Sequence, residues 1–183
     1  MVDVPELTYL MIDGHGDPNT SDSYRDAVAA LYTVSYSLKF QMKRASGVDY
    51  KVGPLEGLWW GSDMSAFSTG DKSAWDWTMM IRQPGVVTED VVAAASEHAQ
   101  GKKGRSAAAD VRLETFTEGR AAQILHAGPY SAEGPTIARL HAFIEEQGFA
   151  FDGRVQKHHE IYLSDPRRTT PARLKTIIRQ PVA

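Results

Sequence analysis

The segment from Lys157 to Leu163 holds the residues with the greatest potential for chemistry. If it is a strand, its side chains alternate between two faces of a sheet, so His158, Glu160 and Tyr162 share one face. The other face, which we expect to be the helix-covered core, takes His159, Ile161 and Leu163. A carboxylate between an imidazole and a phenol suits general acid or base catalysis, because burial raises a carboxyl pKa toward neutral pH. Glu160 is therefore the leading catalytic candidate. The alternative is a surface glutamate paired with His158 or an arginine.

Aromatic side chains give a second signal. Trp59 and Trp60 are adjacent in a strand-like segment and must point to opposite faces, whereas Trp75 and Trp77 share one face. An exposed indole near a carboxylate favours a flat hydrophobic ligand. The alternative is that these tryptophans are buried in the core or at a dimer interface. Tyr130, after a Gly-Pro turn, either directs its hydroxyl into the cleft or packs on the turn.

Several other chemistries lack the residues that they need. The chain has no cysteine, which excludes a disulfide, a thiolate metal site and a cysteine nucleophile. His158, His159 and Glu160 are adjacent, so they face apart on a strand, and no spaced third and fourth ligands follow. Neither a glycine-rich phosphate loop nor a Gly-x-Ser-x-Gly motif occurs. We expect no metal and no cofactor.

Composition favours one soluble globular domain spanning residues 1–183. The chain has 42% hydrophobic and 23% charged residues, as ordinary globular proteins do. Asp3 and Glu6 stand where a signal peptide would be basic, and no apolar run reaches membrane-spanning length. The net charge of −3 and the scattered basic residues argue against a nucleic-acid partner. We expect a cytoplasmic monomer or homodimer without a membrane partner.

Two short motifs recur in the same order and indicate a duplication. IRQP at 81–84 returns at 178–181, and HGDP at 15–18 is similar to HAGP at 126–129. Each half, about 5–85 and 110–183, then predicts strand, helix, strand, strand. The expected strands are 7–12, 50–60, 74–82, 120–126, 157–163 and 174–179, and the expected helices are 22–43 and 132–147. Between the halves we expect a helix at 89–100, a loop at 101–109 and a strand at 110–117.

These elements predict an α+β fold, a pseudo-twofold duplicated βαββ with a mainly antiparallel sheet. Helices should cover one face, and the open face should carry a central ligand cleft. Glu56 takes the place in the first half that Glu160 takes in the second, so both glutamates should line the same groove. A single β-bulge would decide which of Trp59 and Trp60 faces that groove.

The chain resembles the stand-alone GyrI-like small-molecule-binding proteins. The resemblance rests on YRDAVAALYTVSYSLK at 24–39, PLEGLWW at 54–60, DKSAWDW at 71–77, EGRAAQILHAGPY at 118–130 and HHEIYLSDPRR at 158–168. It implies two SH2-like βαββ repeats around a ligand cleft, a fold that is also similar to SOUL-like proteins. Relatives fused to a helix-turn-helix domain are drug-sensing regulators, but no DNA-binding helix pair is found in this sequence.

Some stand-alone relatives are cyclopropanoid cyclopropyl hydrolases, which detoxify DNA-alkylating compounds by adding water to a strained ring. The resemblance implies that Glu160 activates this water at the cleft floor, while Tyr130 or another donor stabilises the oxygen that becomes a phenolate. The implied ligand contacts are Trp59, Trp60, Tyr162, Glu56 and His158. One alternative is a non-catalytic protein that binds or sequesters drugs. Another is a haem or tetrapyrrole carrier, for which only His158 could be an axial ligand.

Overall fold

The computed structural model describes residues 1–61, 71–100 and 106–183. The strands are β1 (Val2–His15), β2 (Leu55–Gly61), β3 (Trp75–Arg82), β4 (Arg112–Ala127), β5 (His158–Tyr162) and β6 (Lys175–Pro181). The α-helices are α1 (Asp22–Ser46), α3 (Glu89–Gln100) and α4 (Gly134–Glu146). Short 3-10 helices are η1 (Lys72–Ala74), η2 (Ser106–Asp110), η3 (Tyr130–Ala132) and η4 (Pro171–Arg173).

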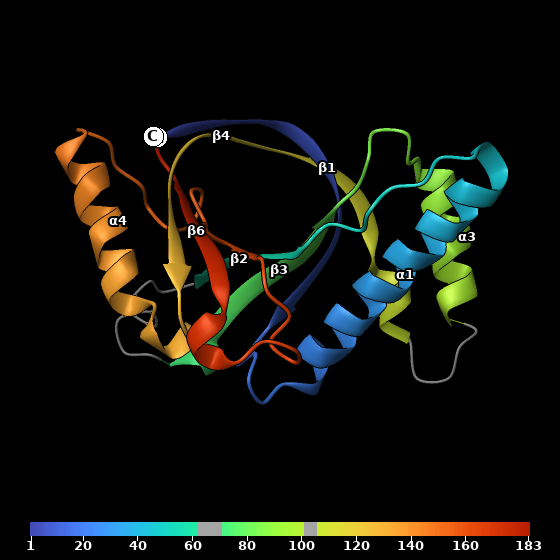
Figure 1. Ribbon diagram of the computed structural model, residues 1–183, viewed down its shortest axis with the longest axis horizontal. Coiled ribbons are helices and arrows are strands. Elements are labelled where there is room, and N and C mark those ends of the chain that lie inside the picture. Colours follow the sequence, from blue (N-terminus) through green and yellow to red (C-terminus); the bar gives the residue numbers. More distant parts are fainter. Residues whose placement is uncertain (62–70, 101–105) are drawn as a thin grey trace.

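The strands form one antiparallel sheet that closes into a barrel in the order β1-β3-β2-β5-β6-β4 (Figure 1). The mixed α+β class and the antiparallel pairing are confirmed. Exchanging β1, β2 and β3 for β4, β5 and β6 leaves this order unchanged apart from its direction. Two βαββ units would give such an order, although an origin by duplication stays a prediction.

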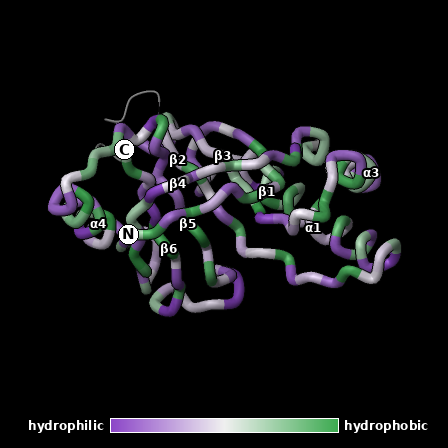
Figure 2. Tube along the Cα trace, turned by 90° about the horizontal axis from the view of Figure 1, so that it is seen from above, coloured by the Kyte–Doolittle hydropathy of each residue, from purple (hydrophilic) through white to green (hydrophobic). Residues whose placement is uncertain are grey.

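The helices lie on the outside of the barrel, with α1 and α3 at one end and α4 at the other (Figures 1 and 2). α1 begins after Ser21, whose side chain accepts a hydrogen bond from the Tyr24 backbone, and it ends at Gly47 in a left-handed conformation. Its apolar stripe packs against alternate residues of β1 and β3. α4 buries Leu140 and Ile144 against Ala122 of β4 and Ile178 of β6.

The inner side of the barrel has its own apolar residues, and these alternate with those under the helices. Tyr9, Met11, Leu58 and Met80 form this inner cluster. Both sides of the central strands are therefore buried, because the sheet closes on itself. The expectation of a free face opposite the helices is wrong for this reason.

Pairing between β1 and β4 explains why these two strands are longer than expected. β4 pairs with β1 from Arg112 to Ala121 and with β6 from Ala121 to Ala127. The two strands expected at 110–117 and 120–126 are thus one strand, with Gly119 at a left-handed φ of 73° between them. This long-range partner also extends β1 through the polar residues near the N-terminus.

Candidate functional site

Glu160 lies on the outer, helix-bearing side of the barrel. It pairs with Gly57 of β2, and the neighbouring pair is His158 with Trp59. Paired residues lie on the same side of a sheet, and Trp59 belongs to the core cluster that packs with α1. Glu160 therefore lies between α1 and α4 rather than opposite the helices. The assignment of His159 to the helix-covered core is wrong, because that side chain points into the barrel.

A chain of hydrogen bonds holds the Glu160 carboxylate. Tyr162 donates its hydroxyl to Oε2 at 2.7 Å, and His158 Nε2 lies 3.1 Å from Oε1. The indole Nε1 of Trp59 donates in turn to the Tyr162 oxygen at 3.1 Å. Only 15% of the Glu160 side chain is exposed, so it does not face solvent, although it pairs with His158 as the alternative expected.

The pKa of Glu160 moves in the direction opposite to the one expected from burial. Burial alone would raise this pKa, but the hydrogen bonds and charge of His158 and the hydrogen bond of Tyr162 lower it below the usual value. Glu160 is therefore ionised at neutral pH. The expectation of a raised pKa fails because His158 and Tyr162 stabilise the charged form.

Glu133, at the start of α4, is the carboxyl whose pKa is raised. Its side chain is 5% exposed, and its Oε1 has no hydrogen-bond partner among the described residues. Burial, and then the negative charge of Glu160, raise the pKa of Glu133 to about 8. At neutral pH a protonated carboxylic acid thus lies beside an ionised carboxylate. Such a difference in pKa allows one glutamate to act as a general acid and the other as a general base.

The turn between β4 and α4 explains how Glu133 reaches the site. Gly128 has a φ of 143°, which a residue with a side chain rarely adopts, and its N–H donates to the Leu174 carbonyl at 3.0 Å. His126 contacts the Thr136 hydroxyl at 3.0 Å and the Pro129 carbonyl at 3.3 Å. The chain is thereby directed over β5, where Glu133 makes no capping hydrogen bond to its own helix.

Glu133 was not among the site residues predicted from the sequence. A glutamate followed by Gly134 and Pro135 reads as an ordinary helix start, where acidic residues are common. The feature that could have indicated Glu133 is its position in the same turn as Tyr130, which was a predicted site residue. Neither burial nor proximity to Glu160 can be read from that local pattern.

Tyrosines from both halves surround the two glutamates. The Tyr130 ring meets the Tyr162 ring edge-on with centroids 5.6 Å apart, and Tyr130 is 38% exposed. Burial and the charges of Glu133 and Glu160 raise the pKa of Tyr130 to about 12. Burial and the charge of Glu160 also raise the pKa of Tyr24, which α1 contributes. These phenols stay protonated and remain hydrogen-bond donors.

The adjacent side chains of Trp59 and Trp60 point to opposite sides of the sheet, as alternation along a strand requires. Trp59 lies on the side of Glu160 and is 4% exposed, and it packs against Tyr24 with centroids 6.1 Å apart. A side chain at Gly57 would place its Cβ 2.8 Å from the Trp59 Nε1, so glycine leaves room for the indole. Trp60 lies on the inner side, with the Lys157 Nζ 3.5 Å from its ring centroid. Trp60 is therefore not beside Glu160, contrary to its assignment as a ligand contact there.

Glu56 also lies on the inner side. It pairs with Ile161 rather than with Glu160, and its Oε2 is 3.0 Å from the His159 Nε2. Glu56 and Glu160 therefore do not line one groove, because the register places Gly57 opposite Glu160. A shift of one residue reverses the side that a strand residue faces.

Two hollows in the described surface lie along the helices. One is lined by residues of α1 and α3, and the other by residues of α4 and the segment after it, and neither includes Glu160. In the described ranges, no three His, Asp or Glu side chains are arranged to hold a metal ion. None of the helices there has the length and apolar character needed to cross a membrane.

The comparisons with known proteins agree with this architecture. The family model of the GyrI-like small molecule binding domain matches residues 1–183. The chain is 43% identical to an uncharacterized conserved protein from Listeria innocua, with 100% of this chain and 90% of that chain covered and a TM-score of 0.91. It is 41% identical to a structure described as a hydrolase from Listeria innocua, with the same coverage and a TM-score of 0.86.

A more distant likeness concerns the fold alone. The C-terminal domain of EcmrR is 13% identical, with 100% of this chain and 94% of that chain covered and a TM-score of 0.59. No protein with a curated function matches the chain. The full-length match of the family model, with the two Listeria structures, shows that this chain belongs to the family of GyrI-like small-molecule-binding domains.

Proposed function

We propose that the protein binds small aromatic molecules beside Glu160 and hydrolyses reactive cyclopropanoid compounds, which would detoxify them. The observation that carries this proposal is the buried pair of Glu133 and Glu160, one protonated and one ionised at neutral pH. Such a pair supplies a proton donor and a proton acceptor to one reaction. The partly exposed ring of Tyr130, which packs edge-on against Tyr162, offers an aromatic surface to a ligand.

Each carboxyl group has a distinct part in the proposed reaction. Glu160 accepts a proton from a water molecule as the water oxygen attacks the unsubstituted carbon of the cyclopropane. The bond from that carbon to the ring breaks, and its electron pair moves to the carbonyl oxygen of the conjugated dienone. Glu133 donates a proton to this oxygen, which yields a phenol. The proton on Glu160 then returns to Glu133, so no other reactant is consumed.

Tyr130 has a supporting part. Its pKa of about 12 keeps the hydroxyl protonated, so it can donate a hydrogen bond to the oxygen on which charge develops. Tyr162 and His158 hold the Glu160 carboxylate in place through their contacts with its two oxygens. The description of two similar structures as hydrolases is consistent with addition of water.

The test uses a duocarmycin-like cyclopropanoid and follows the ring-opened product by its mass. We expect wild-type turnover, and a decrease of about 10²- to 10⁴-fold in Glu160→Gln and in Glu133→Gln, because each loses a proton-transfer group. Glu146→Gln, an exposed change on α4, is the matched control. Full turnover by Glu160→Gln would exclude this mechanism.

Drug binding without catalysis is the second candidate. It is favoured by the low pKa of Glu160, because a buried carboxylate surrounded by aromatic rings attracts a lipophilic cation. In that case wild-type protein binds the cyclopropanoid in a stoichiometric complex and releases no product. Glu160→Gln would then lose affinity for a cationic dye and keep its affinity for a neutral dye of the same shape.

A further inference from the structure

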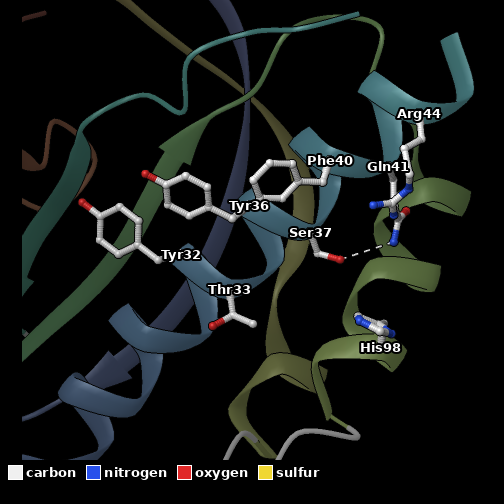
Figure 3. A pocket seen from close by; sticks show the side chains of 8 residues that line it. All are labelled: Tyr32, Thr33, Tyr36, Ser37, Phe40, Gln41, Arg44 and His98. Carbon is white, nitrogen blue, oxygen red and sulfur yellow. Dashed lines mark hydrogen bonds between the residues drawn. The ribbon is translucent and has the colours of Figure 1, made fainter. Parts of the chain in front are cut away.

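Three aromatic rings form a stacked row on α1. Tyr32, Tyr36 and Phe40 are spaced four residues apart, and successive ring centroids are 6.5 Å apart with interplanar angles of 26° and 29°. Residues with this spacing lie on one side of a helix. Figure 3 shows the three rings projecting from the same side of α1, whereas Gln41 and Arg44 lie toward α3. We call these three rings the aromatic row.

The aromatic row is exposed although it is apolar. Tyr36 is 49% exposed and Phe40 is 51% exposed. The rings line a hollow of about 510 Å³, whose lining residues are Tyr32, Thr33, Tyr36, Ser37, Phe40, Gln41, Arg44 and His98. At ~1.5 Å per residue the row extends for about 12 Å along the helix. Because neighbouring rings already contact one another, the row is ordered before a ligand binds and needs little rearrangement.

One end of the aromatic row reaches the site of Glu160. The Tyr32 hydroxyl contacts the backbone of Leu55 at the start of β2, the strand that also carries Trp59. Tyr130 lies within electrostatic range of Tyr32 as well as of Glu133 and Glu160. Tyr130, Tyr36 and Phe40 are exposed, so their rings are accessible to a ligand. The row therefore continues outward from the site.

We propose that the aromatic row is a subsite for the second flat aromatic unit of an elongated ligand whose reactive unit lies at Glu160. This inference rests on the proposed function and specifies its substrate class, a cyclopropanoid joined to a further planar ring system. Planar rings gain affinity by stacking on aromatic side chains. A second copy of this chain is the competing occupant, but the continuity of the row with Tyr130 favours a ligand.

The test compares two substrates that differ only in length. The short substrate is a cyclopropanoid with a small N-acyl group, and the long one carries an indole-2-carbonyl group in its place. In the double variant Tyr36→Ala with Phe40→Ala, we expect KM for the long substrate to rise on the order of tenfold. Both kcat values and the KM for the short substrate should stay unchanged. Phe143→Ala, which removes a ring that is 37% exposed on α4, is the control.

Failure of the subsite and failure of the proposed function are distinguishable. If wild-type protein hydrolyses neither substrate, equilibrium dialysis with the two ring-opened compounds still measures the contribution of the aromatic row to binding affinity. Tighter binding of the long compound, weakened only in the double variant, supports the subsite. Equal binding of both compounds by wild-type protein overturns it. A wild-type dimer that the double variant converts to a monomer, seen by light scattering, also overturns it and makes the row a subunit interface.

Discussion

The molecule holds two pairs of buried glutamates, one inside the barrel and one on its outer side, and only the inner pair is neutralised. Inside the barrel, Glu56 and Glu118 contact the fully buried His159 at 3.0 and 2.7 Å. Arg179 donates a further hydrogen bond to Glu118 at 2.7 Å. On the outer side, Glu133 and Glu160 approach one another, and the Oε1 of Glu133 has no partner in the described part of the chain.

The difference separates structural carboxylates from those that are available for chemistry. Burial would lower the pKa of His159, but its hydrogen bonds to Glu118 and Glu56 raise it, so the cation is favoured. Burial would raise the pKa of Glu118, and His159 and Arg179 lower it. Two cations thus balance two carboxylates inside the barrel. The outer pair has no such balance, and one member stays protonated. A buried carboxyl with a strongly shifted pKa is typical of a functional site.

The largest expected effect comes from breaking the inner pair. Glu118→Gln removes the charge that joins His159 to Arg179 and leaves the guanidinium buried without its counter-ion. We expect the free energy of unfolding to fall by about 3 to 5 kcal/mol, the usual result of removing one partner of a buried ion pair. Urea unfolding followed by circular dichroism measures this loss.

A change on the same strand is the control for this prediction. Glu114→Gln affects a side chain that is 48% exposed and paired with Arg112. Its effect should stay within about 0.5 kcal/mol, as for most surface substitutions. A loss below 1 kcal/mol in Glu118→Gln would contradict the view that the inner network is structural.

The next effect is a pH dependence of stability to which Glu133 of the outer pair contributes. The pKa of Glu133 is raised from 4.5 to about 8 on folding. Between these values the folded state binds a proton that the unfolded state has lost, so stability falls as pH rises from about 5 to 8. The decrease should be on the order of 3 kcal/mol. Urea unfolding at several pH values in this window measures it.

Glu133→Gln separates this effect from that of His159. The raised pKa of His159 also makes stability fall as pH rises through that pKa. The glutamine variant keeps the histidine contribution and loses the part due to Glu133, so its stability should fall less steeply. It should also be more stable than wild-type protein at pH 8. Parallel curves for the two proteins would mean that Glu133 is not protonated in the folded state at neutral pH.

Local patterns were sufficient to predict much of the fold. The helix at 89–100 matches α3 (Glu89–Gln100), and α1 begins at Asp22 as expected. A long apolar stripe with caps determines such helices from nearby residues. The closed barrel was not predicted, because it depends on the pairing of β1 with β4, and no local signal reports which distant strands pair.

The site was also predicted only in part, because some of its features depend on contacts between distant residues. Strand alternation correctly placed His158, Glu160 and Tyr162 on one side, since it needs only the order of residues. The grouping of Glu56 with Glu160 needed the register between β2 and β5, which a single residue reverses. The direction of the Glu160 pKa needed its hydrogen-bond partners as well as its burial. Both depend on tertiary contacts that the sequence does not display.

The smallest expected effect tests how the outer carboxylate stays ionised. Tyr162→Phe removes the hydroxyl that donates to Glu160 at 2.7 Å and accepts from the Trp59 indole. We expect a stability loss of about 1.5 to 3 kcal/mol, the range for one hydrogen bond to a charged group. The pKa of Glu160 should rise, because a hydrogen bond that lowers it is lost. Urea unfolding and carbon NMR of the labelled carboxyl measure the two changes.

Tyr36→Phe is the matched control, since it removes a hydroxyl from a ring that is 49% exposed. It should leave both the stability and the Glu160 pKa unchanged. If Tyr162→Phe also leaves the Glu160 pKa unchanged, His158 alone would keep this carboxylate ionised. The outer pair would then depend on one partner, as a weaker version of the inner pair in which His159 contacts two carboxylates. A rise in that pKa would instead show that the neutral Tyr162 phenol helps to keep Glu160 ionised, as His159 and Arg179 do for Glu118 inside the barrel.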